Sequence, residues 1–286
     1  MGTVEEVRIA RRTGFCYGVR EAIDYAKLAA AQGKPTHTLG QVVHNEGVIS
    51  ELEAQGIQTV DTLDDVASGA AVVIRAHGVT PEVMHRAEEK GLEVIDGTCT
   101  WVLQEQKELA KLVEDGYTIV LLGTPNHPEV VGLLGFAPDA ILVDEEEDWD
   151  RIPRRKRMAL ICQSTQPPWK FEKLAAFMVS RAHELKIVNT VCPVTIRRQQ
   201  DTLELAGSVD LVIVVGVTGG TSTPIEDLET VAQRIYELAG TDAARPNATQ
   251  LAHEAVTAVA EPAYRSTSLG RDAGSQAAGA PVAGAA

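Results

Sequence analysis

Short apolar runs alternate along this chain with longer segments in which apolar residues recur at helical spacing. We predict strands over residues 4–10, 71–76, 92–95, 118–122, 158–162 and 211–216. We predict helices over residues 19–32, 81–90, 101–114 and 224–238. Such alternation is typical of parallel sheets in α/β proteins. Polar side chains after the strands are therefore candidate site residues, because open α/β sheets bind ligands at the carboxyl ends of their strands.

Three of the four cysteines lie far apart in turn-like settings, namely Cys16, Cys99 and Cys192. No two cysteines form the close CxxC pair that zinc ribbons use. Three separate thiolates can instead hold an iron–sulfur cluster and leave one iron free for substrate. They divide the chain into comparable thirds, which favours a site at the meeting point of three α/β units. The alternative interpretation is three unrelated buried thiols.

Composition narrows the class of protein. The chain has 286 residues, 44% hydrophobic and 23% charged, and its net charge of −14 argues against a nucleic-acid surface. No apolar stretch approaches the ~20 residues that cross a membrane, and the N-terminus lacks a secretory pattern. We therefore expect a cytoplasmic protein without nucleic-acid or membrane partners. Residues 241–286 are rich in Ala and Gly, and we expect a disordered tail there.

Three histidines each follow an apolar run, namely His44, His77 and His127. A single histidine in such a place is more often structural, but three in one cleft could bind an anion such as a phosphate. Glu129, two residues beyond His127, is a candidate proton donor, because a closed site would raise the pKa of its carboxyl. The alternative for Glu129 is a solvated loop carboxylate.

Hydroxyl side chains stand at two further places. Ser164 and Thr165 follow the predicted strand at 158–162, where a hydroxyl could relay a proton or position a substrate hydroxyl. Thr221 and Ser222 precede the predicted helix at 224–238 and could cradle an anion together with backbone N–H groups. Taken alone, that loop is equally a capped helix start.

Six ordered motifs resemble the 4-hydroxy-3-methylbut-2-enyl diphosphate reductase (LytB/IspH) family. They are Gly-Phe-Cys-Tyr-Gly-Val at 14–19, Val-Val-His-Asn at 42–45, Ala-His-Gly-Val at 76–79, Asp-Gly-Thr-Cys at 96–99, His-Pro-Glu-Val at 127–130 and Cys-Pro-Val-Thr at 192–195. The resemblance implies a trefoil of three α/β units around a [4Fe–4S] cluster, in which one iron lacks a protein thiolate and binds the substrate hydroxyl. It further implies reductive removal of that hydroxyl to give isopentenyl and dimethylallyl diphosphate, with ferredoxin or flavodoxin as electron donor.

The resemblance also assigns roles. The cluster ligands would be Cys16, Cys99 and Cys192. The catalytic residues would be Glu129, His127 and Ser164, the last in place of a family threonine. The residues that contact the small diphosphate substrate would be His44, His77, Thr165, Thr221 and Ser222. Cys162 has no ligand role in the family, and we expect it to be structural.

The third unit departs from the family pattern. We expect units at residues 14–97 and 98–188, and a shortened third unit from residues 1–13 with 189–240. The family's Ser-Ser-Asn phosphate-binding segment is missing, because the predicted strand at 211–216 passes directly into the loop before the helix. The first alternative is therefore a similar [4Fe–4S] enzyme that reduces or dehydrates another hydroxylated or anionic substrate. A second is an electron carrier or sensor, but a carrier needs no Glu129 proton relay, so we expect the family reaction.

Overall fold

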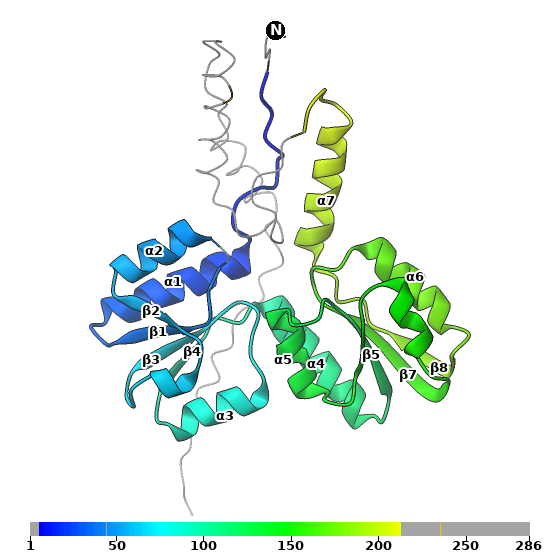
Figure 1. Cartoon of the computed structure of the whole chain (residues 1–286), viewed down its shortest axis with the longest axis horizontal. Coiled ribbons are helices and arrows are strands. Elements are labelled where there is room, and N and C mark those ends of the chain that lie inside the picture. The colour runs from blue at the N-terminus through cyan, green and yellow to red at the C-terminus, as the bar shows by residue number, and fades with distance from the viewer. Residues whose placement is uncertain (1–5, 44, 213–234, 236–286) are drawn as a thin grey trace, which may run out of the picture.

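The computed structural model describes residues 6–43, 45–212 and 235, and these contain two parallel four-stranded sheets (Figure 1). The first sheet has the order β2-β1-β3-β4 and comprises β1 (Thr36–Leu39), β2 (Ile57–Val60), β3 (Ala71–Ile74) and β4 (Glu93–Asp96). The second has the order β6-β5-β7-β8 and comprises β5 (Thr118–Leu122), β6 (Ile141–Val143), β7 (Arg155–Cys162) and β8 (Ala182–Ile187). Both sheets thus repeat one strand order, and the predicted α/β class is confirmed.

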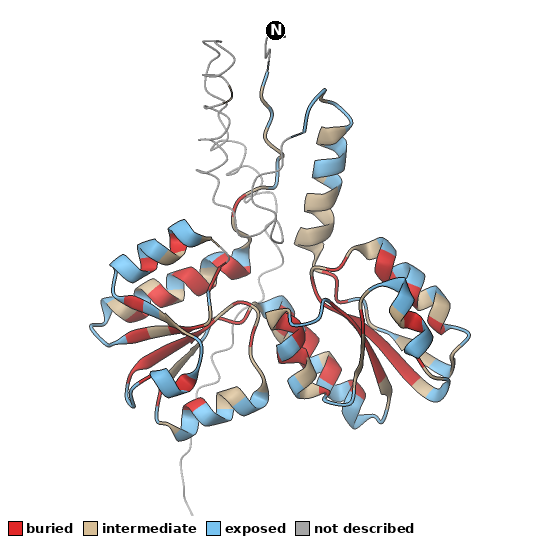
Figure 2. Cartoon of the chain, in the orientation of Figure 1, coloured by how far each residue is buried: buried red, intermediate tan, exposed pale blue. Residues whose placement is uncertain are grey.

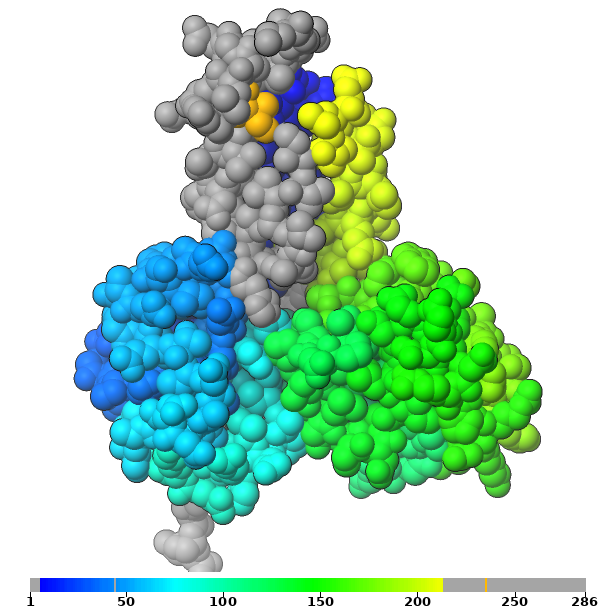
Figure 3. Space-filling model, viewed as in Figure 1, coloured from blue at the N-terminus to red at the C-terminus, as the bar shows by residue number. Residues whose placement is uncertain are grey.

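Helices cover both faces of each sheet. They are α1 (Tyr17–Ala31), α2 (Glu46–Ala54), α3 (Pro81–Glu89), α4 (Thr100–Glu114), α5 (Pro128–Phe136) and α6 (Pro168–Met178). A further helix, α7 (Pro193–Ala206), has no buried residue. Two 3-10 turns, Leu63–Asp65 and Glu146–Arg151, complete the loops. The two sheet units touch along their facing sides, and α7 rises above their junction (Figures 1 and 3). No helix in the described part of the chain is long and apolar enough to cross a membrane.

Each sheet is packed between two apolar clusters, and Figure 2 shows the buried positions along the strands and the facing sides of the helices. In β3, Val73 packs with α1 and α2, whereas Val72 and Ile74 pack on the face covered by α3. All three are fully buried. Parallel strands covered on both faces must be apolar at successive positions, which explains why the sequence pattern revealed β3 and β5 so clearly.

Local signals set several boundaries. The predicted helix at 81–90 is confirmed as α3. Its start is set by Thr80, whose hydroxyl accepts a hydrogen bond from the Val83 N–H at 3.3 Å, and by Pro81 in the first turn.

The predicted strand at 4–10 is wrong over residues 6–10, which pair with no strand and form no regular element.

Several predicted features lie outside the described residues. They are the helix at 224–238 apart from residue 235, the tail at 241–286, the shortening of the third unit and most of the strand at 211–216. Residues 211 and 212 are described, and they are not in a strand.

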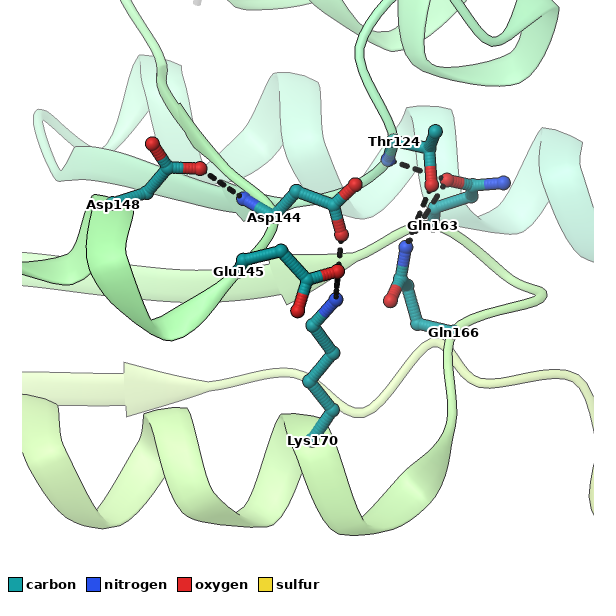
Figure 4. A network of polar contacts seen from close by, with 7 residues as sticks. All are labelled: Thr124, Asp144, Glu145, Asp148, Gln163, Gln166 and Lys170. Atoms are coloured by element: carbon teal, nitrogen blue, oxygen red, sulfur yellow. Dashed lines mark hydrogen bonds and ion pairs between the residues drawn. The ribbon is translucent and has the colours of Figure 1, made fainter.

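A buried lysine ties α6 to the loop after β6 (Figure 4). Lys170 is 6% exposed, and its ammonium group donates to Asp144 at 2.6 Å and to Glu145 at 2.9 Å. Asp148 accepts from the backbone N–H of Asp144 at 3.1 Å and fixes that loop. The two contacts of Lys170 therefore hold the carboxyl edge of the second sheet against α6, the helix that follows β7.

We expect Lys170→Met to lower the free energy of unfolding by about 2 kcal/mol, because it leaves two carboxylates without their buried cation. Lys173→Met is the matched control on the same helix, since Lys173 pairs with Glu146 in a half-exposed position. Its effect should stay below about 0.5 kcal/mol. Urea denaturation measures both, and equal effects of the two variants would contradict the assigned role of Lys170.

Candidate active site

Three cysteines stand at the N-termini of three helices. Cys16 caps α1, Cys99 caps α4 and Cys192 caps α7. All three are half-buried, whereas Cys162 is fully buried. Negative charge on Cys16 or on Cys192 raises the pKa of Cys99, so the three thiols lie within electrostatic range of one another. The structure thus brings together cysteines that are far apart in sequence.

Helix N-termini shape the electrostatics of this centre. Burial raises the pKa of the Cys99 thiol to about 11, and the first-turn amides of Trp101 and Val102 oppose that rise. Burial likewise raises the pKa of Cys192, and two first-turn amides of α7 oppose it. Because the positive ends of three helices meet here, the site favours thiolates once a positively charged partner is bound.

A half-buried guanidinium adds positive charge. Arg198 of α7 donates from Nη2 to the carbonyl of Gly14 at 2.7 Å. Burial lowers its pKa, and the thiolates of Cys16 and Cys192 oppose that shift. Arg198 therefore fixes the loop that carries Cys16 and offsets anionic charge at the centre.

Three half-buried thiols are the donor set at this centre. Among the described residues, no group of three His, Cys, Asp or Glu side chains closes on one metal ion. A cluster spreads its thiolates over several irons, so ligands that are near one another without converging on one point suit it. The fit around the thiols is tight, since a Cβ added at Gly18 would lie 2.6 Å from the sulfur of Cys99.

Glu129 and Ser164 form a buried pair beside these thiols. Glu129 is 2% exposed in the first turn of α5, and Ser164 follows β7. The Ser164 N–H donates to one carboxyl oxygen of Glu129 at 2.5 Å, and its hydroxyl donates to the other at 2.9 Å. Burial raises the pKa of Glu129, and the two Ser164 bonds and Glu105 partly oppose the rise. The alternative of a solvated loop carboxylate is therefore wrong.

One backbone bond joins this pair to the cysteine centre. The N–H of Cys192 donates to the carbonyl of Ser164 at 2.8 Å. Ser164 therefore contacts Glu129 through its N–H and hydroxyl and Cys192 through its carbonyl. Ser164 thus connects the buried carboxyl of Glu129 to a cysteine of the centre.

Amide side chains brace the loops that follow β5 and β7, and Figure 4 shows Gln163 and Gln166 beside Thr124. The Gln163 side-chain oxygen accepts from the Thr124 N–H at 2.9 Å, and its amide donates to the Thr165 hydroxyl at 2.7 Å. The Gln166 amide donates to the Thr124 hydroxyl at 3.4 Å. Thr165 thus serves the bracing of the loop after β7 in this structure.

Two of the predicted histidines lie side by side. The rings of His77 and His127 are edge to face, with centroids 5.4 Å apart. His127 also caps α5, since its Nδ1 accepts from the Glu129 N–H at 3.2 Å. His77 comes from the loop after β3 and His127 from the start of α5, so each sheet unit contributes one histidine to this pair. The predicted contacts His44, Thr221 and Ser222 lie outside the described residues.

Glu105 is a buried acid that the sequence interpretation missed. It lies on α4 and is 0% exposed, on the face that also buries Val102 and Leu109. Burial and then the charge of Glu129 raise its pKa well above the ordinary range of a carboxyl. An acid at an apolar position of the helical repeat was the sequence signal that could have identified it.

Cys162 has a structural environment. It ends β7 within the apolar cluster under α6, and its N–H donates to the Thr190 hydroxyl at 3.1 Å. Burial raises the pKa of its thiol to about 12. It is therefore set apart from the three helix-capping cysteines.

Comparisons with known proteins agree with this geometry. Residues 7–235 match the family model described as LytB protein. A 4-hydroxy-3-methylbut-2-enyl diphosphate reductase from Citrifermentans bemidjiense is 36% identical over 212 residues, which cover 74% of this chain and 75% of the relative. A protein of the same name from Nitratiruptor sp. is 32% identical over 219 residues, which cover 76% of this chain and 78% of the relative.

Solved structures share the architecture. The (E)-4-hydroxy-3-methyl-but-2-enyl diphosphate reductase, called the terminal enzyme of the non-mevalonate pathway, aligns with a TM-score of 0.64 at 31% identity over 80% of this chain and 82% of that one. The E-1-hydroxy-2-methyl-but-2-enyl-4-diphosphate reductase from Plasmodium falciparum has a TM-score of 0.69 at 24% identity, over 87% and 86% of the two chains, which speaks for the fold alone. The resemblance seen in the motifs is confirmed, and the chain belongs to the LytB protein family.

Proposed function

We propose that this chain reduces 4-hydroxy-3-methylbut-2-enyl diphosphate to isopentenyl and dimethylallyl diphosphate. The observation that carries the proposal is the joining of the Glu129–Ser164 pair to Cys192, one of three cysteines that cap helices at a shared centre. The relatives from Citrifermentans bemidjiense and Nitratiruptor sp., which are 36% and 32% identical to this chain, are named for that activity. Cys16, Cys99 and Cys192 would hold a [4Fe–4S] cluster with one iron lacking a protein thiolate.

A bound cluster would pass on two electrons from the electron donor, one at a time, and would offer an iron to polarise the substrate hydroxyl. Two electrons and two protons replace the carbon–oxygen bond by a carbon–hydrogen bond and release water. One of these protons is delivered through Glu129, which lies in a site from which water is largely excluded. The Ser164 hydroxyl gives its own proton to the departing oxygen and takes the proton delivered by Glu129 in return.

The diphosphate would lie against the histidine surface formed by His77 and His127. Protonated imidazole binds phosphate by charge and by hydrogen bonding. His44, Thr165, Thr221 and Ser222 remain candidates for further substrate contacts, and a ferredoxin or flavodoxin remains the proposed electron donor. The buried carboxyl–hydroxyl pair favours this enzyme over an electron carrier, which moves no proton to a substrate.

Serine substitutions test the cluster ligands. We expect Cys16→Ser, Cys99→Ser and Cys192→Ser each to abolish the visible absorbance and bound iron of protein reconstituted without oxygen. Cys162→Ser is the matched control and should retain both, because that thiol lies in the apolar core. The ligand assignment fails if Cys162→Ser loses the cluster while one of the other three variants keeps it.

Substitutions at the pair test the proton path. With reduced viologen as donor, we expect Glu129→Gln and Ser164→Ala to lower kcat by about a hundredfold or more, since each removes a proton-transfer group. Ser164→Thr keeps the hydroxyl and should retain activity. Wild-type protein with an intact cluster that yields no five-carbon diphosphates would overturn the proposed reaction and favour another hydroxylated substrate.

A further inference from the structure

Glu105 is a carboxyl group buried on α4. It is 0% exposed, and within the described part of the chain neither of its oxygens has a hydrogen-bond partner when it is treated as a carboxylate. A buried ionised carboxylate without a partner is very costly, so such groups are neutral or paired. The surroundings of Glu105 must therefore supply a proton or a cation.

Among the residues that the structure describes, the groups that face Glu105 are acids and one hydroxyl. They are Glu129 on α5, Thr190 and Cys192 in the segment between β8 and α7, and Cys162 at the end of β7. The Thr190 hydroxyl already donates to the carbonyl of Cys162. No cation is among these groups, so Glu105 is neutralised by a proton rather than by an ion pair.

Glu129 is the group to which a protonated Glu105 would donate a hydrogen bond. Its two oxygens already accept from the N–H and hydroxyl of Ser164, which favours the ionised form of Glu129. A protonated Glu105 can donate one more hydrogen bond to it. Burial and the nearby charge of Glu129 both raise the pKa of Glu105, whereas the bond from Glu105 lowers the pKa of Glu129. The shared proton thus resides on Glu105.

We propose that Glu105 is a positioning residue that shares one proton with Glu129 and thereby keeps a proton stored beside Ser164. This inference rests on the proposed function in one respect, because the proposed reaction is the step that consumes the stored proton. When the Ser164 hydroxyl gives its proton to the departing oxygen, the Glu105 proton passes through Glu129 to restore that hydroxyl, and both carboxyls are left ionised. Solvent then returns a proton to the pair, and no bond to carbon or change of oxidation state occurs at Glu105.

The pH dependence of kcat tests the shared proton. In the wild type, the pair loses its last proton only when two adjacent buried carboxylates form. In Glu105→Gln, Glu129 ionises with no charged neighbour and accepts a bond from the amide, so its proton leaves at lower pH. We expect the alkaline limb of the reconstituted enzyme to move down by about one pH unit or more.

Glu114→Gln is the matched control, since Glu114 is the exposed last residue of the same helix, and it should leave the limb in place. A role of Glu105 in packing alone would be preserved by the isosteric glutamine. An unmoved alkaline limb in active Glu105→Gln would therefore overturn the proposal.

Infrared spectroscopy separates this inference from the proposed reaction. We expect the reconstituted wild type to keep a protonated-carboxyl C=O band at pH 8, and Glu105→Gln to lack it while Glu114→Gln retains it. The absence of that band in the wild type would overturn the shared proton whatever the substrate. Its presence in a protein that does not turn over the diphosphate would instead reject the proposed function and leave the pair standing.

Discussion

The molecule must hold many acidic groups together in a centre with little water. Three half-buried thiols and the two buried carboxyls of Glu105 and Glu129 lie within range of one another's charge. Like charges in a poorly solvated place repel strongly. The surrounding architecture answers this constraint with the positive ends of three helices, the guanidinium of Arg198 and the donors of Ser164. The parallel sheets are what allow these elements to start from one place.

Much of this arrangement could be predicted from local sequence. Strands such as β5 are continuous apolar runs, and helices such as α3 begin with a capping residue followed by proline. The three cysteines, Glu129 and Ser164 were identified because they follow strands or open helices, where parallel sheets place ligands. The local sequence alone therefore identified these site residues.

What the sequence did not reveal depends on contacts between distant elements. Glu105 belongs to the site only because α4 packs on α5, and no local pattern reports that contact. Strand β1 was missed because two of its four residues are threonines that are buried in spite of their polarity. The strand predicted at 4–10 failed because apolar alternation alone does not provide a pairing partner. In each case tertiary packing overrode the local pattern.

The positions of the three cysteines also make the centre a link between separate segments of the chain. Each sheet has apolar clusters on both of its faces and can hold its own core, whereas Cys16, Cys99 and Cys192 open helices in separate segments of the chain. A prosthetic group bound by all three closes two long loops at once, so part of its binding free energy becomes free energy of folding. Loss of such a group would remove that contribution, and its effect would fall first on how the starts of α1, α4 and α7 are held together.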